Sequence, residues 1–372
     1  MCTPTLSFLK KYLSEEEIIK LQNKKAIHTE QFNGLSLVRL TKDYRYYPRG
    51  TIFFDGGIIP GYPRIMRVLH LGNGIRRYLK GIFYVEEKVD GYNVRVAMIH
   101  GSLFAFTRGG FICPFTTNRI SSLIDLDFFN KYPGCGIAGE VVGPGSPYNT
   151  EAIPYISEDI VFFAFDLFDK DGKNLSVEER YKILEPFRIQ QVRKWGPFSA
   201  EDTDTIRKVV LELDRDCREG IVVKPISNGK MIKCVTLSSS LRDLQASADL
   251  ITEIPAGYYI QRILRAVFFS HEFGVPLDDN YLLESAKALY LSAGKVLKEV
   301  AEGGSVKESF QVKTESKDTI EKLIDHLSRP GISTKLLSIE KSDDYYKARF
   351  QKIYKEGTRE IRHKLMGHGF FD

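Results

Sequence analysis

The spacing of apolar residues changes near residue 236, and this change divides the chain into two successive kinds of fold. Upstream, short β-like runs such as Phe83 to Glu87 and Val94 to Ile99 are separated by clusters of glycine and proline. Downstream, Leu241 to Phe269 and Ser285 to Glu302 carry apolar residues at helical spacing. The pattern predicts an α+β protein, in which a core of antiparallel sheets with helices is followed by helical domains that begin near Leu237 to Ser240.

Local signals predict further elements on both sides of this boundary. Ser176 is the expected N-cap of a helix that runs to Gln191, because Glu179 completes a capping box with it. The segment Gly50 to Gly57 predicts a strand that ends in a turn. The other expected strands are Leu103 to Phe106, Ile160 to Phe165 and Gly220 to Lys224, and the other expected helices are Asp318 to Leu327 and Asp343 to Met366.

Length and composition fit a globular protein that can bind a polyanion. The 372 residues suffice for two or three domains, and the formal net charge of +5 is compatible with a basic groove. No apolar run is long enough to cross a bilayer, and the charged stretch Met1 to Lys25 predicts an amphipathic helix rather than a signal peptide. The five cysteines include no C-x-x-C pair, which favours a reducing cytoplasm. The histidines show no metal-binding spacing, so any metal should be a hard ion held by carboxylates.

The segment Glu86 to Arg95 is the most informative for chemistry. A predicted strand delivers Lys88, Gly91 permits a tight turn, and a second strand follows. A lysine amine with an ordinary pKa of about 10.4 is a poor nucleophile, but nearby cations or desolvation lower that pKa and activate it. Taken alone, the K-x-D-G pattern recurs by chance and is equally typical of a surface turn.

Five further short patterns follow this turn, and their order is informative. Together with K-x-D-G they resemble the ordered motifs of the covalent nucleotidyltransferases, which comprise DNA ligases, RNA ligases and mRNA capping enzymes. The resemblance implies an ATP-grasp-like ligase core in which Lys88 takes AMP from ATP as a lysyl adenylate. The five patterns are Thr107 to Gly110, Ala138 to Val141, Phe162 to Asp166, Glu219 to Lys224 and Lys230 to Lys233.

The resemblance and the charge of ATP assign roles to single residues. Arg108, Lys224 and Lys233 are expected to contact phosphate oxygens and to lower the pKa of Lys88. Glu140 and Glu219 are the carboxylates that can hold Mg²⁺ or Mn²⁺, and Glu140 can instead contact the ribose. The remaining residues assigned to AMP binding or to the motif turn are Glu86 at the adenine amino group, Phe165 (preferred to Phe163) stacked on adenine, Asp90 and Gly91 in the turn, and Glu87, Asn93 and Arg95 beside it.

Two lysines compete for the last phosphate contact. Lys230 and Lys233 lie three residues apart, so on a strand they face opposite ways and only one can reach the phosphates. Lys233 fits the strand better. Lys230 follows Asn228-Gly229, a turn signature, and is expected to be solvated.

The residues around the lysine also separate the branches of the superfamily. DNA ligases and capping enzymes usually carry arginine where this chain has Asn93, and the arginine here is Arg95. Helices rather than an OB-fold follow Val235, and the whole chain resembles the archaeal homodimeric ATP-dependent RNA ligases. The resemblance implies four parts: an N-terminal α/β module at 1–60, a nucleotidyltransferase catalytic domain at 61–236, a helical dimerisation domain at 237–300 and a C-terminal helical domain at 301–372.

The implied reaction joins or circularises single-stranded RNA, between a 5′-phosphate and a 3′-hydroxyl, through an RNA adenylate. Two alternatives remain. One is an RNA-binding protein built on a degenerate nucleotidyltransferase core. The other is a nucleotidyltransferase with a different acceptor, such as a capping guanylyltransferase.

Two surfaces after residue 236 are candidate contacts for partners. The apolar run from Tyr259 to Phe269 covers more than one side of a helix, so it packs either inside the chain or against a second copy. The resemblance favours the homodimer. The predicted helix from Asp343 to Met366 carries a basic face that either contacts RNA or is merely solvated. Its basic residues are Lys347, Arg349, Lys352, Lys355, Arg359 and Arg362.

Overall fold

The computed structural model describes residues 4–32, 35–148, 153–227, 229–328 and 331–369. Their contacts divide the chain into two units, which the chain enters alternately. The first unit contains residues 1–64, 91–141 and 161–191, and the second contains residues 65–90, 142–160 and 192–372. The lysine of the K-x-D-G turn therefore belongs to the second unit, while the strand that follows the turn belongs to the first.

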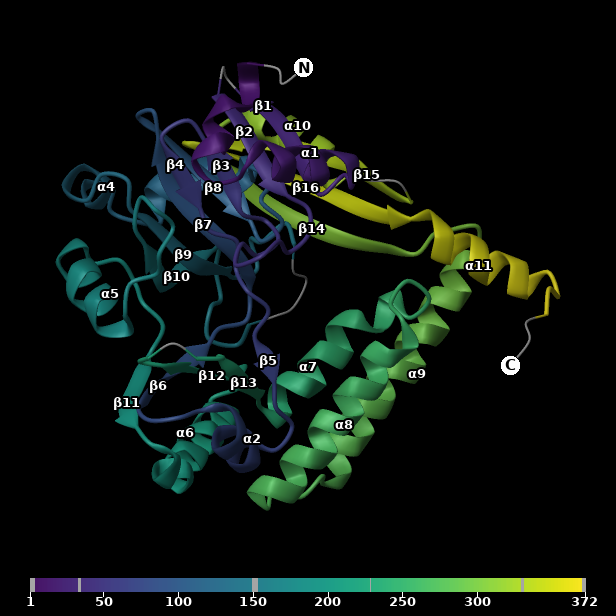
Figure 1. The fold of residues 1–372 in the computed structure, drawn as a ribbon. Helices are drawn as coiled ribbons and strands as arrows, with labels where there is room; N and C mark the ends of the chain where they lie inside the picture. The colour runs from purple at the N-terminus through teal and green to yellow at the C-terminus, as the bar shows by residue number, and fades with distance from the viewer. Residues whose placement is uncertain (1–3, 33–34, 149–152, 228, 329–330, 370–372) are drawn as a thin grey trace. The chain divides into compact units, whose positions relative to one another are not determined.

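The first unit is built on two four-stranded sheets, ordered β1-β2-β3-β4 and β10-β9-β7-β8 (Figure 1). Leu37 and Ile52 from one sheet share a buried cluster with Phe104 and Phe106 from the other, so apolar packing holds the two sheets together. The strands are β1 (Ile27–Phe32), β2 (Leu35–Leu40), β3 (Ile52–Phe54), β4 (Gly57–Ile59), β7 (Tyr92–Ile99), β8 (Ser102–Thr107), β9 (Gly136–Val142) and β10 (Val161–Phe168).

Two helices of the first unit begin at capping boxes. The predicted capping box of Ser176 and Glu179 is present at α5, but this helix ends at Leu184 instead of Gln191, because Pro186 has no backbone N–H with which to continue the helical hydrogen bonds. The single helix predicted for residues 1–25 is two helices, since Ser14 and Glu17 form a capping box that starts a new one. The helices are η1 (Pro4–Lys11), α1 (Glu15–Asn23), α3 (Pro114–Arg119), η2 (Ile120–Ser122), α4 (Asp127–Lys131), α5 (Val177–Leu184) and η3 (Glu185–Phe187).

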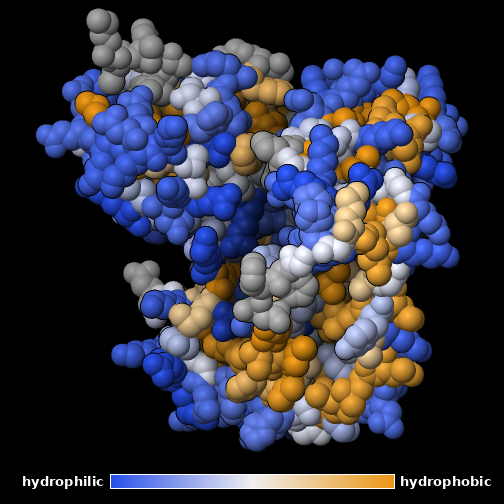
Figure 2. Space-filling view, turned by 90° about the vertical axis from the view of Figure 1, so that its right-hand side faces the viewer, coloured by the Kyte–Doolittle hydropathy of each residue, from blue (hydrophilic) through white to orange (hydrophobic). Residues whose placement is uncertain are grey.

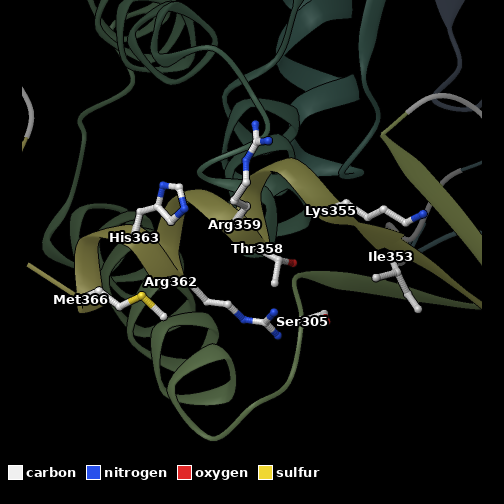
Figure 3. Close-up of a pocket in the computed structure, with 8 residues that line it drawn as sticks. All are labelled: Ser305, Ile353, Lys355, Thr358, Arg359, Arg362, His363 and Met366. Carbon is white, nitrogen blue, oxygen red and sulfur yellow. The ribbon is translucent and has the colours of Figure 1, made fainter. Parts of the chain in front are cut away.

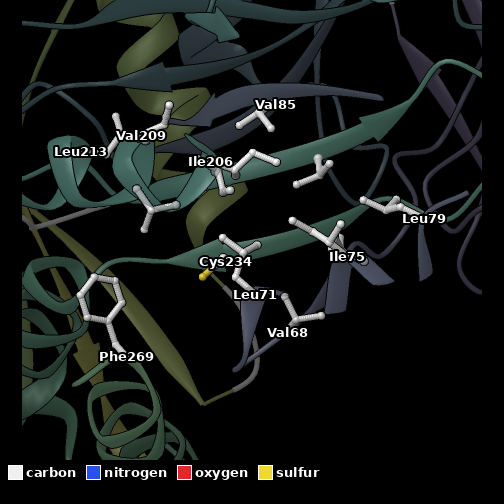
Figure 4. Packing of buried hydrophobic residues seen from close by; sticks show 14 of the residues in the cluster. Val68, Leu71, Ile75, Leu79, Val85, Ile206, Val209, Leu213, Cys234 and Phe269 are labelled. Atoms are coloured by element: carbon white, nitrogen blue, oxygen red, sulfur yellow. The ribbon is translucent and has the colours of Figure 1, made fainter. Parts of the chain in front are cut away.

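The second unit contains a five-stranded sheet in the order β11-β6-β12-β13-β5. Alternate residues of its strands, among them Val85 and Cys234, are buried in an apolar cluster with residues of α2 and α6 (Figure 4). The intervening residues therefore lie on the opposite face of the sheet. The elements are β5 (Met66–Arg67), α2 (Leu71–Tyr78), β6 (Phe83–Lys88), β11 (Lys194–Phe198), η4 (Ala200–Asp202), α6 (Thr203–Arg215), β12 (Gly220–Pro225) and β13 (Ile232–Val235).

Three helices follow this sheet, as the helical spacing predicts. The predicted run from Leu241 to Phe269 is divided into two helices, with Pro255 at the N-terminal boundary of the second. Within the described ranges, no helix combines the length and apolar character needed to span a membrane. The elements are α7 (Leu237–Ser247), η5 (Ala248–Leu250), α8 (Ala256–Phe273) and α9 (Asp279–Ala301), and α7 contacts both α8 and α9.

The C-terminal part is not wholly helical, so the prediction of one helix from Asp343 to Met366 is wrong over its first half. A strand occupies that half, and its buried residues Ala348, Phe350 and Tyr354 alternate with more exposed ones, which is the period of a strand. It is the middle strand of a sheet ordered β14-β16-β15. The elements are β14 (Lys307–Thr314), α10 (Lys317–Leu327), β15 (Ile332–Ser342), β16 (Tyr345–Tyr354) and α11 (Lys355–Leu365).

A buried carboxylate, Glu272, connects α8 to the start of α2. Its fully buried side chain accepts hydrogen bonds from the backbone N–H of Leu71 and, at 2.8 Å, from that of Gly72. The Arg207 guanidinium donates to it at 3.2 Å. A carboxylate at this position satisfies free N–H groups at the positive end of the α2 dipole.

We expect Glu272→Ala to destabilise the second unit by about 3 kcal/mol, because two N–H groups at the start of α2 would lose their acceptor and the Arg207 guanidinium would lose one of its two carboxylate partners. Thermal unfolding followed by circular dichroism should show a Tm lowered by several degrees. Glu321→Ala, which removes an exposed carboxylate of α10, is the matched control and should unfold like the wild type. Equal Tm values for the two variants would contradict the role of Glu272.

Candidate active site

The register of the five-stranded sheet brings the predicted lysines to one face. In the antiparallel pair of β6 and β12, Lys88 lies opposite Gly220 and Glu86 lies opposite Val222. Val222 in turn lies opposite Lys233 of β13. Directly paired residues share a face, so Lys88, Glu86 and Lys233 lie on the side of the sheet away from its apolar core.

Lys88 ends β6 and is paired with the carboxylate of Glu219, the residue just before β12. Its Nζ donates to Glu219 Oε2 at 2.5 Å, and only 21% of the Lys88 side chain and 10% of the Glu219 side chain are exposed. The backbone beside them is tightly packed, because Gly220 has a φ of +149° and an added Cβ would lie 2.2 Å from the Cys234 carbonyl oxygen. Glycine at 220 therefore permits the close approach of β12 and β13 at this point.

A second ion pair lies on the same face. The Lys224 ammonium is 2.7 Å from Glu86 Oε2, and both side chains are buried. Burying such a pair costs desolvation energy that the mutual attraction only partly offsets. The two residues predicted to contact phosphate and adenine thus hold each other in this structure, and a nucleotide would compete with that pairing.

Two arginines that the sequence reasoning missed border this face. Arg67 of β5 lies next to Lys233, and burial lowers the pKa of its guanidinium while the Glu219 carboxylate opposes that shift. Arg242 of α7 has Nη2 at 3.9 Å from Asp90 Oδ2, the acid of the K-x-D-G turn. No sequence signal marked either one, because β5 has two residues and α7 lies outside the motifs.

The sequence predicts that Glu87 binds AMP, but the structure places its side chain on the other face of the sheet from Lys88. Glu87 lies opposite Ile221, on the core side of the sheet. Its carboxylate accepts from Arg193 Nε at 2.7 Å and from Arg218 Nη1 at 3.2 Å. Successive residues of a strand point to opposite faces, so Glu87 cannot share the face of Glu86 and Lys88. It forms a structural ion cluster instead.

The first unit carries the other predicted site residues on its sheet β10-β9-β7-β8. Asn93 of β7 lies opposite Glu140 of β9, so the two side chains share a face. A Cβ on Gly139 would meet the Phe162 ring, which places that pair on the other side. By alternation Phe165 lies on the side of Glu140.

Two of these residues have neighbours that suit their predicted roles. The Phe165 ring packs edge-on against Tyr62 at 5.0 Å between centroids, and its side chain is half-buried. Arg108 follows β8, is exposed, and donates to the Pro63 carbonyl at 3.3 Å. Exposed guanidinium and half-buried aromatic groups are suited to phosphate and purine contacts respectively.

The sequence predicts that Arg95 binds AMP, but its side chain is buried and contacts backbone carbonyls. Its side chain is 1% exposed, and burial lowers the pKa of its guanidinium to about 9. Nη1 donates to the carbonyls of Gly50 at 2.9 Å and Pro60 at 2.7 Å, and Nη2 donates to the Thr107 carbonyl. These contacts hold three backbone segments together, so the residue is a structural anchor.

Comparisons with known proteins agree with this chemistry. The RNA ligase family matches residues 81–235, and the family described as ligase Pab1020 C-terminal region matches residues 246–368. The structure of a putative ATP-dependent DNA ligase from Aquifex aeolicus is 34% identical, covering 96% of this chain and 100% of that one with a TM-score of 0.89. An archaeal ATP-dependent RNA ligase is 26% identical over 99% of this chain and 100% of its own, also with a TM-score of 0.89.

A curated but uncharacterised protein of Methanocaldococcus jannaschii is 26% identical over 95% of this chain and 94% of its own length. Because the RNA ligase family matches the catalytic part and an archaeal ATP-dependent RNA ligase matches along its full length, the chain belongs to the ATP-dependent RNA ligase family. The predicted family, the fold class and the activity class of ATP-dependent RNA ligase are thereby confirmed.

The position of the two competing lysines leads to a direct test. Lys233 lies on the face of Lys88, whereas Lys230 is exposed and outside the strand. We expect Lys233→Ala to slow transfer of AMP from radiolabelled ATP to the protein on the order of 100-fold, as is typical when a preorganised charged contact is lost. Lys230→Ala is the matched control and should keep the wild-type rate. The reverse ranking of the two variants would assign the phosphate contact to Lys230.

Proposed function

We propose that Lys88 is the nucleophile of this ligase. Its amine attacks the α-phosphorus of ATP, a P–N bond forms, the bond to the bridging oxygen breaks, and pyrophosphate leaves. The observation that supports this assignment is the Lys88 Nζ to Glu219 Oε2 contact of 2.5 Å, on a sheet face that also carries Glu86, Lys224 and Lys233. The Glu219 carboxylate holds the Lys88 amine on this face of the sheet.

Two further steps complete the proposed reaction. The phosphate at the 5′ end of single-stranded RNA attacks the lysyl adenylate, which releases Lys88 and forms an RNA adenylate. A 3′-hydroxyl then attacks the activated 5′-phosphate, so a phosphodiester forms and AMP leaves. Lys224 and Lys233 stabilise the negative charge that develops on the phosphoryl oxygens in these steps.

We assign Mg²⁺ or Mn²⁺ to the carboxylates Glu140 and Glu219. Carboxylate oxygens are the ligands that such hard ions prefer, and a bound ion would supply a Lewis acid at the phosphate. Glu219 precedes β12 in the second unit, and Glu140 lies on β9 in the first. We also propose a cytoplasmic location, because the five cysteines of the sequence include no C-x-x-C pair, which favours a reducing compartment.

We expect the wild-type chain to gain the mass of one AMP when it is incubated with ATP and Mg²⁺. Lys88→Ala should abolish this adduct, and Lys88→Arg should also fail because a guanidinium stays protonated. Intact-protein mass spectrometry measures the adduct. Lys80→Ala, which removes an exposed lysine just before β6, is the control and should react normally. An adduct on the Lys88→Ala variant would refute the nucleophile, and an adduct from GTP but not ATP would favour a capping enzyme.

A homodimer through α8 and α9 is the second part of the proposal. Tyr259 and Phe269 of α8 are buried within their own unit, but Ile263, Val267 and Phe268 are 39–52% exposed. Figure 2 shows apolar side chains gathered over the part of the surface that α8 and α9 form. Contiguous apolar surface of this kind is typical of a subunit interface. The other exposed apolar residues of the two helices are Ile260, Leu264, Leu282, Leu283, Tyr290, Leu291 and Leu297.

Light scattering should give twice the 42.4 kDa chain mass for the wild type at micromolar concentration. The double variant Ile263→Asp, Phe268→Asp should be monomeric, because unpaired carboxylates cannot be buried in an apolar contact. Ile19→Asp is the matched control, since Ile19 of α1 is 51% exposed and Ile263 is 52% exposed. A monomeric wild type would rule out the dimer.

A further inference from the structure

The three-stranded C-terminal sheet has one face that carries mostly charged and polar residues. Along β16, Ala348, Phe350 and Tyr354 are buried, and the intervening residues lie on the opposite face. The register places residues of β14 and β15 directly beside them. This open face carries Lys307, Ser309, Gln311 and Lys313 from β14, Lys347, Arg349, Gln351 and Ile353 from β16, and Ser333, Lys335, Ser338 and Glu340 from β15.

The open face is strongly basic. Five of the side chains just named are lysine or arginine, and Glu340 is the one carboxylate among them, while Lys307 is paired with Glu299 of α9. Lys313 lies directly opposite Lys347, and like charges in that arrangement destabilise a sheet. The neutral residues between the cations are serine and glutamine, which can donate and accept hydrogen bonds. A face with this composition complements an extended anion better than it stabilises the fold.

The open face continues into a pocket beside α11. Ile353 ends the face and also lines this pocket, whose volume is about 310 Å³. Lys355, Arg359 and Arg362 are spaced so that they lie on one side of α11, and they line the pocket together with His363. None of the eight lining residues is acidic. The pocket thus extends the basic character of the sheet.

The side chains around the pocket are spread out rather than gathered at one point. Figure 3 shows Arg362 directed toward Ser305, while Lys355 and Arg359 extend in other directions from the helix. Arg362 Nη2 donates to the Gly304 carbonyl at 3.0 Å, which fixes its position. From Lys355 to Arg362 the helix rises about 10 Å, and from Lys347 to Ile353 the strand spans about 20 Å. A single phosphate would use a small part of this length.

We propose that the open sheet face and the α11 pocket form one track, which binds the sugar–phosphate backbone of the single-stranded RNA substrate. Lysine and arginine contact successive phosphates, and the serine and glutamine side chains contact sugars. The aliphatic Ile353 and Met366 offer apolar contact to bases without reading their sequence. The inference rests on the proposed function, since it takes RNA to be the substrate.

The structure also revises which basic residues of this region can contact RNA. The Lys352 side chain lies on the buried side of β16, where its Nζ donates to the Pro147 carbonyl at 2.9 Å. It also lies 4.1 Å from the centroid of the Phe310 ring. Lys352 is therefore a structural residue, although its position in the sequence suggested the same role as Lys347 and Lys355.

The test compares two fourfold variants of the full chain that lose the same charge. The track variant is Lys335→Ala, Lys347→Ala, Lys355→Ala, Arg359→Ala. The control is Lys287→Ala, Lys298→Ala, Lys317→Ala, Lys322→Ala, which removes four exposed lysines of α9 and α10. Fluorescence anisotropy with a labelled single-stranded RNA of about 20 nucleotides, at several salt concentrations, measures binding without ATP.

We expect the track variant to bind RNA at least about tenfold more weakly, and its slope of log affinity against log salt to fall by about 3, from four contacts at ~0.7 each. The control should match the wild type. Both variants should keep the wild-type Tm and the wild-type rate of Lys88 adenylation, because adenylation needs no RNA.

Equal affinities and salt slopes for the track variant and the control would overturn the proposal. Displacement of labelled RNA by polyglutamate as effectively as by unlabelled RNA would overturn the assignment to RNA, and would indicate an acidic protein partner instead. Failure of the wild type to form an adenylate would refute the proposed mechanism alone, because the RNA-binding comparison is made without ATP.

Discussion

The antiparallel pairing of β6 with β12 is the constraint on which the candidate site depends. It sets Lys88 opposite Gly220, and the residue before Gly220 is the carboxylate that contacts the Lys88 amine. A shift of the pairing by one residue would turn every side chain of one strand to the other face. The apolar residues on the core side, such as Val85 and Ile221, prevent that shift because they must stay buried. Hydrophobic packing therefore specifies the position of the reactive groups.

The same alternation explains why charged neighbours in one short motif have different roles. Glu86 and Lys88 face away from the core, while Glu87 between them is held by Arg193 and Arg218 on the other side. Arg95 is likewise buried, and it ties together three carbonyls of the first unit. The motifs thus combine groups for chemistry with groups for support.

In the C-terminal region, the spacing of apolar residues does not distinguish a strand from a helix. Lysine and arginine are frequent from Lys341 to Lys364, and the apolar residues among them fit a helix nearly as well as a strand. The buried faces of β14 and β16, with Phe310 and Phe350 stacked, select the strand. Once the strand is formed, some basic residues become buried and others line an open face. The distribution of charge in space follows from pairing and not from charge content.

Much of the fold could be predicted from the sequence, because the local signals for strands, helix caps and helices are strong. The strands that became β6, β7, β8, β10 and β12, the capping box at Ser176, and the change to helices at Leu237 all follow from patterns within about ten residues. The order of the motifs also determined the family, since six short patterns in one sequence order are far more specific than any one of them.

Only the tertiary structure decided which of these residues share a face and which are buried. Glu87 and Arg95 lie in the motif and yet serve the fold, whereas Arg67 and Arg242 lie outside it and border the site. The register of strands that are far apart in the sequence brings Lys233 and Lys88 to one surface. Sequence patterns report the period of a single segment, but pairing between distant segments depends on the packing of the whole sheet. For that reason the sequence by itself determined the family and most of the local elements, and the tertiary structure decided how the candidate site residues are arranged.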